Sequence, residues 1–146
     1  MCKVANKVAL VTGGSRGIGS SIVRKLIRNG ARVAFTYLSS PEKAEQLVRD
    51  VSADPGMIKA YQSDASDFNQ SKELIQQVIQ DFGTIDILVN NAGVTRDNLI
   101  MRMTEEQWDE VIRINLKSAF NLSKFAVTPM MKQRSGSIIN ITSVVG

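Results

Sequence analysis

The stretch TGGSRGIG, residues 12–19, constrains the fold of this chain more than any other feature of the sequence. It follows a buried-type apolar run and precedes a segment in which apolar residues recur at helical spacing. Gly13, Gly17 and Gly19 permit a sharp turn and a close approach of the backbone to a phosphate, which the amides and dipole of the helix would then face. The motif predicts a strand, turn and helix that bind the diphosphate of a dinucleotide. The alternative is a glycine-rich connection without a ligand, and the spacing G-x-x-x-G-x-G differs from the more common G-x-G-x-x-G.

Apolar runs with little polar alternation recur along the chain, and helical patterns separate them. Such runs are typical of parallel strands that are covered on both faces. The expected strands are KVALVTGG (7–14), which runs into glycine, ARVAFTY (31–37), MIKAYQ (57–62), IDILVN (85–90) and SIINITS (137–143). Strands that alternate with helices imply right-handed crossovers. The sequence therefore predicts an α/β fold, a Rossmann-type doubly wound parallel sheet with strand order 3-2-1-4-5.

The segments between the first four strands carry helix start and stop signals. The first helix is expected to end at the Asn-Gly pair at residues 29–30. A second helix is expected to begin at Pro41, with Ser40 as its cap. A third helix should follow Asp67 and end at Gly83.

A longer helical stretch is expected before the fifth strand. Thr104 and Gln107 form a capping-box signature for its start. Its pattern runs to about Gln133, and we expect it to be bent or divided near Asn115 and disturbed at Pro129.

Composition limits the chemistry that this chain can carry. Its 146 residues and 43% hydrophobic content suit one folded domain, residues 1–146. The sequence has no His and one Cys, Cys2, so no metal site and no serine-histidine hydrolysis are expected. No apolar run approaches the roughly 20 residues that cross a bilayer, and MCKVANK lacks the apolar stretch of a secretory signal. We expect no membrane association and a cytoplasmic location, or an organelle lumen if a transit peptide has been removed.

The net charge of +4 is unevenly distributed. Residues 1–41 carry seven Lys or Arg and no acid, whereas the remainder carries 11 basic and 14 acidic residues. The basic part lacks a Lys/Arg cluster or an aromatic platform, so nucleic acid is not an expected partner. The charge indicates support for a small phosphate-bearing ligand.

The residues after the second expected strand indicate which nucleotide binds. A free ribose 2′-hydroxyl is usually held by an acid about 20 residues past the glycines. Here residues 36–40 read TYLSS, and the first acid in the chain is Glu42. Arg16, inside the glycine motif, is suited to a 2′-phosphate. NADP(H) is therefore favoured over NAD(H); the alternative for Arg16 is a solvated loop charge.

Two further strand ends carry polar residues. NNAG, residues 90–93, follows the fourth expected strand, where side-chain amides can brace neighbouring backbone and Gly93 allows a ligand to approach closely; the same residues also suit an ordinary turn. Asp64, after the third expected strand, is suited either to accept a hydrogen bond from an adenine amino group or to serve as a turn carboxylate.

Four motifs in order, TGGSRGIG, NNAGVTRDNLIMRM, RINLKSAF with Asn115, and IINITSVVG, resemble the short-chain dehydrogenase/reductase family. Within that family the chain resembles the 3-oxoacyl-acyl carrier protein reductases of type II fatty acid synthesis. The resemblance implies that Asn115 interrupts its helix and holds a water of a proton relay, and that Ser143 hydrogen-bonds the substrate carbonyl. It also implies a cofactor-binding set: Gly13, Ser15, Arg16, Gly17, Ile18, Gly19, Tyr37, Leu38, Asp64, Ala65, Asn91, Ala92, Gly93 and Ile114.

The family's proton donor is a tyrosine of a Tyr-x-x-x-Lys pair that lies beyond the serine. This sequence has no such pair, because Pro41 follows Tyr37 at the fourth position and Ala65 follows Tyr61. The resemblance therefore implies a fold truncated after strand five, with an exposed apolar edge that favours association, and a chain that is inactive alone.

The resemblance implies NADPH-dependent reduction of a 3-oxoacyl thioester, carried by acyl carrier protein, to the 3-hydroxyacyl form. Lys132 and Arg134 would help to receive the acidic carrier protein, or would be ordinary helix-end cations. A homo-oligomer is expected, a tetramer in the complete family member. Two alternatives remain open: a noncatalytic nucleotide-binding or subunit-interaction fragment, and a short-chain reductase of another carbonyl substrate.

Overall fold

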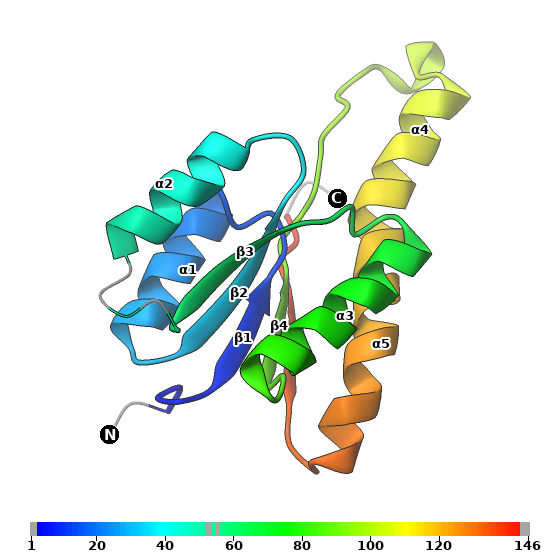
Figure 1. Ribbon diagram of the computed structural model, residues 1–146. Coiled ribbons are helices and arrows are strands. Elements are labelled where there is room, and N and C mark those ends of the chain that lie inside the picture. Colours follow the sequence, from blue (N-terminus) through cyan, green and yellow to red (C-terminus); the bar gives the residue numbers. More distant parts are fainter. Residues whose placement is uncertain (1–2, 52–53, 55, 144–146) are drawn as a thin grey trace.

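The computed structural model describes residues 3–51, 54 and 56–143 and shows one parallel β-sheet with helices on both faces (Figure 1). The strand order is β3-β2-β1-β4-β5, and all four strand pairs are parallel. This confirms the predicted Rossmann-type doubly wound sheet. The strands are β1 Val8–Val11, β2 Arg32–Tyr37, β3 Ile58–Gln62, β4 Ile87–Asn90 and β5 Ser137–Asn140.

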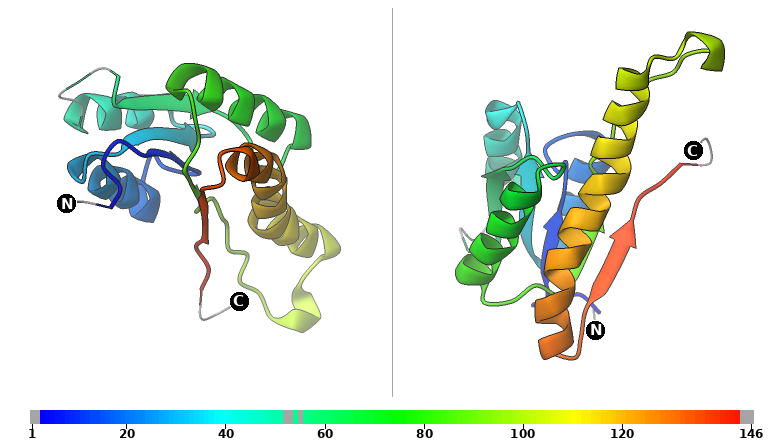
Figure 2. Two further views of the ribbon diagram at one scale, coloured as in Figure 1. Left: turned by 90° about the horizontal axis from the view of Figure 1, so that it is seen from below. Right: turned by 90° about the vertical axis from the view of Figure 1, so that its right-hand side faces the viewer.

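Two hydrophobic cores form because successive strand residues point to opposite faces of the sheet. On one face, Ala9 and Val11 pack with Val23 of α1 (Gly17–Arg28) and Leu47 of α2 (Pro41–Val51). The other face is covered by α3 (Phe68–Phe82) and α5 (Ser118–Lys132), and both helix pairs are visible on either side of the sheet in Figure 2. The carboxyl ends of the strands therefore meet at one edge between two helical layers.

The predicted end of α1 at Asn29 and the predicted start of α2 at Pro41 are confirmed, whereas a side-chain cap from Ser40 stays a prediction. The Asp67 side chain accepts a hydrogen bond from the N–H of Gln70 at the start of α3, and Gly83 ends that helix at φ 85°. Thr104 and Gln107 form the capping box of α4 (Glu105–Val111). Local residues thus fix both helix starts.

The long helical stretch is divided as predicted. After α4, residues Ile112–Lys117 form a π-helical turn, η2, which contains Asn115. The helix α5 then runs without a break through Pro129, so the expected disturbance at that residue is not observed. A short 3-10 helix that the pattern did not indicate, η1 (Ile100–Arg102), precedes α4. It lies on a segment that projects from the body of the molecule in Figure 1.

The fifth strand is shorter than the predicted range 137–143. Ile141 N donates to Asn90 O, the residue at which β4 ends. All four β5 residues are exposed, including Ile138 and Ile139. The predicted apolar edge is therefore present, while residues 144–146, which complete the IINITSVVG motif, and Cys2 lie outside the described part.

Among the helices that the structure describes, none is both long enough and apolar enough to cross a bilayer.

Candidate functional site

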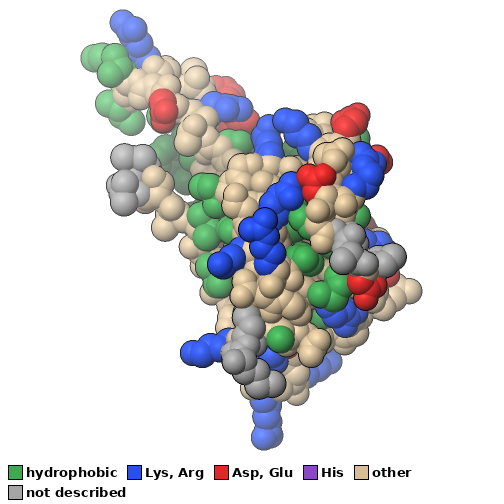
Figure 3. All heavy atoms as spheres, turned by 90° about the vertical axis from the view of Figure 1, so that its left-hand side faces the viewer, with side chains coloured by type: hydrophobic (Ala, Val, Ile, Leu, Met, Phe, Trp, Pro, Cys, Tyr) green, Lys and Arg blue, Asp and Glu red, His purple; other side chains and the backbone are tan. Residues whose placement is uncertain are grey.

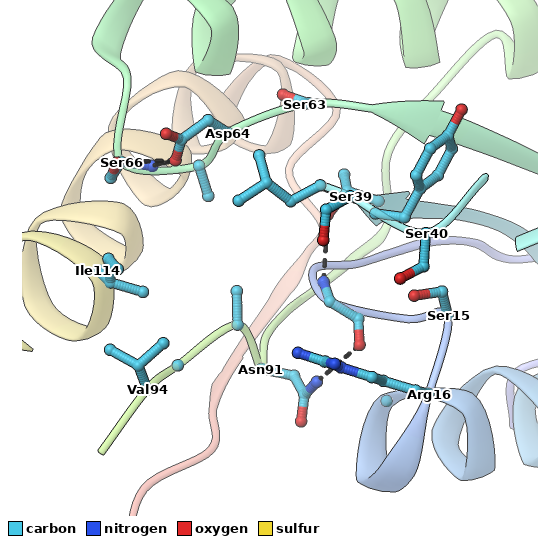
Figure 4. Close-up of a pocket in the computed structure, with 18 of the residues that line it drawn as sticks. Ser15, Arg16, Ser39, Ser40, Ser63, Asp64, Ser66, Asn91, Val94 and Ile114 are labelled. Carbon is cyan, nitrogen blue, oxygen red and sulfur yellow. Dashed lines mark hydrogen bonds between the residues drawn. The ribbon is translucent and has the colours of Figure 1, made fainter. Parts of the chain in front are cut away.

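A cavity of about 400 Å³ opens at the carboxyl ends of the central strands (Figure 4). Its walls come from the glycine motif, the ends of β2 and β3, the segment after β4 and the η2 turn. All fourteen residues predicted to bind a cofactor line it. The cavity is also lined by seven residues that were not predicted: Thr36, Ser39, Ser40, Ser63, Ser66, Val94 and Arg113.

The glycine motif has the backbone that its sequence predicts. Gly13 and Gly17 adopt φ values of +62° and +54°, in the left-handed region that favours glycine. A Cβ on Gly19 would lie 2.1 Å from the carbonyl oxygen of Gly13, so that position packs the turn against the helix. A Cβ on Gly14, which was not singled out, would lie 2.6 Å from Cβ of Phe35.

Gly17 differs from these tightly packed glycines. Within the part of the chain that the structure describes, a Cβ at Gly17 would meet no atom within 4 Å, although the residue lines the cavity. A side chain there would occupy open space at the start of α1. The glycine therefore leaves room for a group bound against the backbone.

The amino end of α1 is open toward this space. Arg16, its N-cap, makes no side-chain capping bond, and the first turn contains no acid. The first N–H groups of a helix have no partner within the helix, and the helix dipole makes this end positive. The open space at Gly17, the unpaired N–H groups of the first helical turn and the positive end of the helix dipole are together suited to bind a phosphate.

Two threonine hydroxyls accept hydrogen bonds from backbone N–H groups around the cavity, and the sequence analysis did not predict this role. Thr12 Oγ1 accepts hydrogen bonds from the N–H groups of Asn91 and Ala92, both at 2.9 Å. Thr36 Oγ1 accepts from Gly13 N at 3.1 Å. These bonds fix the segment after β4 and the glycine motif relative to each other.

The two asparagines of NNAG brace backbone and side chains, as expected. Asn91 Nδ2 donates to the carbonyl oxygens of Thr12 and Gly13, at 3.0 and 3.2 Å. Asn90 Nδ2 donates to Asn140 Oδ1 at 2.8 Å and so links β4 to β5. Gly93 packs against Asn115, because a Cβ there would lie 2.8 Å from Asn115 Oδ1.

Asp64 is a turn carboxylate in this structure. Its Oδ1 accepts from both the N–H and the hydroxyl of Ser66, at 2.8 and 2.7 Å. Asp64 also lines the cavity, so contact with a base stays a prediction. Arg113, which the sequence analysis did not identify, lies beside this pair.

Polar side chains gather at the opposite end of the cavity. Figure 4 shows the side chains of Ser15 and Ser40 facing each other, with Arg16 below them, and Ser39 also lines the cavity. Hydroxyls and a guanidinium are suitable donors to a phosphate. The local chemistry at this end fits an additional anionic group.

Asn115 and Ser143, the two predicted catalytic residues, lie outside the cavity lining. Asn115 Oδ1 accepts from Val94 N, and Asn115 Nδ2 donates to Val94 O, both at 2.8 Å. The predicted interruption of the helix is confirmed by η2, whereas the water-holding role stays a prediction. Ser143 is exposed in the segment after β5, and its contact with a substrate also stays a prediction.

We expect Asn115→Asp to destabilise the fold by about 1 kcal/mol, because a carboxylate oxygen would replace the donor that faces Val94 O. Thermal and urea unfolding at neutral pH measure the change. Asn69→Asp is the control, since it adds the same charge at an exposed position in the first turn of α3, where the helix dipole favours an acid. Equal stability of the Asn115 variant and the unchanged chain would contradict this role.

Tyr61, the other tyrosine of the described part besides Tyr37, does not supply an acid-base group to the cavity. Burial raises the pKa of the Tyr61 hydroxyl well above its ordinary value, and its hydrogen bond to Asp81 and the charge of that carboxylate raise it further. Tyr61 lies outside the cavity lining and is unsuited to give up a proton near neutral pH. No group of three His, Cys, Asp or Glu side chains in the described ranges could hold a metal ion.

The sequence and the structure are both similar to those of known proteins. The family model described as short chain dehydrogenase matches residues 7–146. The 3-oxoacyl-acyl-carrier-protein reductase FabG of Staphylococcus aureus is 51% identical over 140 residues, which are 96% of this chain and 57% of that protein. The protein of the same name from Thermotoga maritima is 44% identical over 144 residues, 99% of this chain and 58% of that protein.

A solved structure is also similar along nearly the whole chain. It is a short-chain dehydrogenase/reductase of Serratia marcescens, in a mutant form with two phenylalanines replaced by leucine, and it has a TM-score of 0.88 and 36% sequence identity. The alignment covers 97% of this chain and 57% of that one. The chain thus spans a little over half the length of the proteins that it matches.

Proposed function

The chain belongs to the short-chain dehydrogenase family, and from this premise we propose that it forms the cofactor-binding part of an NADPH-dependent reductase of 3-oxoacyl thioesters. The observation that carries the proposal is the open amino end of α1, which faces a cavity lined by every residue predicted to contact the cofactor. A helix amino end of this kind binds the diphosphate of a dinucleotide.

The cavity residues divide between the parts of such a cofactor. The glycine motif and the first turn of α1 would hold the diphosphate, and Arg16 with the hydroxyls of Ser39 and Ser40 would hold a 2′-phosphate. Asp64 and Ala65 would lie at the base. When bound, the reduced nicotinamide supplies the hydride that the reaction requires.

The substrate class is proposed from the relatives, which are named 3-oxoacyl-acyl-carrier-protein reductases. Exposed basic residues, Lys132 and Arg134, lie at the end of α5 and would attract an acidic carrier protein. The projecting segment around η1 exposes Leu99 and Met101, and hydrophobic side chains are visible at the tip in Figure 3. These apolar groups would lie beside an acyl chain or in a subunit contact.

We expect the 146-residue chain to bind NADPH but to oxidise it with a short 3-oxoacyl thioester about 10² to 10⁴ times more slowly than the Staphylococcus aureus relative. The reason is that the sequence contains no Tyr-x-x-x-Lys pair to place a tuned proton donor at the substrate oxygen. Absorbance of NADPH, followed with and without thioester, measures the rate, and the Staphylococcus aureus enzyme is the positive control.

Turnover at the relative's rate would contradict this account of the proton donor. NADPH binding without any turnover would favour the second candidate, a noncatalytic nucleotide-binding module, which the missing pair also supports.

A further inference from the structure

Arg113 connects two walls of the cavity. It lies in η2, the π-helical turn that also contains Ile114 and Asn115. Its Nη1 donates to Ser66 Oγ at 2.5 Å and lies 3.8 Å from Asp64 Oδ2. A guanidinium from the long helical stretch thus reaches the loop that follows β3.

Ser66 transmits this contact to Asp64. The Ser66 hydroxyl accepts from Arg113 and donates to Asp64 Oδ1, which also accepts from Ser66 N. Both bonds from Ser66 therefore hold the same carboxylate oxygen. Among the described residues, Asp64 Oδ2 is engaged by the longer ion pair alone, and it stays available as an acceptor beside the cavity.

The backbone of the same loop is held separately. Asn121 of α5 is fully buried, and its Nδ2 donates to the carbonyl oxygens of Ala65 and Ser66, at 3.1 and 3.2 Å. Loss of the Arg113 contact should therefore leave the loop backbone in place, with Ser66 N still bonded to Asp64 Oδ1. It should release the Ser66 hydroxyl and the Oδ2 end of the Asp64 carboxylate.

The charge of Arg113 has a second effect. A ligand that carries several phosphates repels a carboxylate in the same cavity. The Arg113 guanidinium beside Asp64 offsets that repulsion. The positive charge of Arg16 lies in another part of the same cavity (Figure 4). A carboxylate can thereby take part in recognition of an anionic nucleotide.

We propose that Arg113 is a positioning residue for base recognition: through Ser66 it orients Asp64 so that Oδ2 accepts a hydrogen bond from the exocyclic amino group of adenine. This inference rests on the proposed function, because it concerns the same cofactor. If Arg113 has this role, a residue of η2 helps to select the base that the cavity binds.

The experiment compares NADPH with its hypoxanthine analogue, which carries a carbonyl oxygen in place of that amino group. The unchanged chain should prefer NADPH by about 10-fold or more in dissociation constant, the effect of a hydrogen bond to a charged acceptor. Arg113→Gln should reduce this preference to within about threefold. Arg113→Lys should restore most of it, since an ammonium group can donate to Ser66 Oγ and pair with Asp64.

Lys117→Gln is the matched control, because it removes a cation from the same turn at a residue outside the cavity lining. It should keep the full preference for adenine. A merely structural role for Arg113 would weaken both nucleotides equally and leave their ratio unchanged. An unchanged ratio in Arg113→Gln, with NADPH still bound by the unchanged chain, would overturn this inference alone. If the unchanged chain bound neither nucleotide, the proposed function would fail and this inference with it.

Discussion

The substitution Gly17→Glu is expected to weaken NADPH binding by about 100-fold or more. The position lines the cavity at the first residue of α1, and a side chain there enters open space. A carboxylate would compete for the helix amides and repel the diphosphate. Nucleotide fluorescence or calorimetric titration measures the loss.

Gly83→Glu provides a matched control for backbone strain. Gly83 has φ +85°, compared with +54° for Gly17, and a Cβ at either residue would meet no atom of residues 3–51, 54 and 56–143 within 4 Å. Both substitutions place a non-glycine residue in the left-handed region, at a similar cost of about 1 kcal/mol in stability. Only the Gly17 variant should lose NADPH, and equal affinities of the two variants would contradict the placement of the diphosphate.

Arg16→Gln is expected to weaken NADPH binding by about 10- to 100-fold while the affinity for NADH changes by less than about twofold. The two nucleotides differ only in the 2′-phosphate, so the ratio of their dissociation constants isolates that contact. Titration of both nucleotides against both proteins gives the ratio directly.

Arg24→Gln tests whether the loss of any guanidinium from this part of the chain has the same effect. Arg24 lies on α1 but pairs with Asp50 at 2.8 Å and does not line the cavity. Its removal should leave both affinities unchanged. Arg16 is only a solvated loop charge if its substitution lowers NADPH and NADH binding by the same factor, or lowers neither.

The fold was open to prediction because its signals are local. The bond from Gln70 N to Asp67, the left-handed Gly83 and the reciprocal bonds of Thr104 and Gln107 each involve residues close in sequence. The strand order followed from the unbroken alternation of strands and helices. The η1 helix was missed because it has too few residues for a periodic pattern.

Parts of the cavity could be predicted where the backbone has a positive φ that favours glycine, as at Gly13 and Gly17. The bracing by Asn91 was predicted from the NNAG motif, but the bracing by Thr12 and Arg113 was not, because their contacts join distant residues. The hydroxyl of Thr12 accepts from amides 79 and 80 residues away, and Arg113 reaches Ser66 across 47 residues. A Thr at the end of a strand, or an Arg within a helical pattern, carries no local signal of such a partner.

The most direct test of the account is calorimetric titration of the folded 146-residue chain with NADPH and, separately, with NADH. The account predicts saturable binding of one NADPH per chain at the amino end of α1, and weaker binding of NADH because Arg16 then lacks the 2′-phosphate. Absence of saturable binding for both nucleotides, in material whose circular dichroism shows a folded α/β protein, would contradict it.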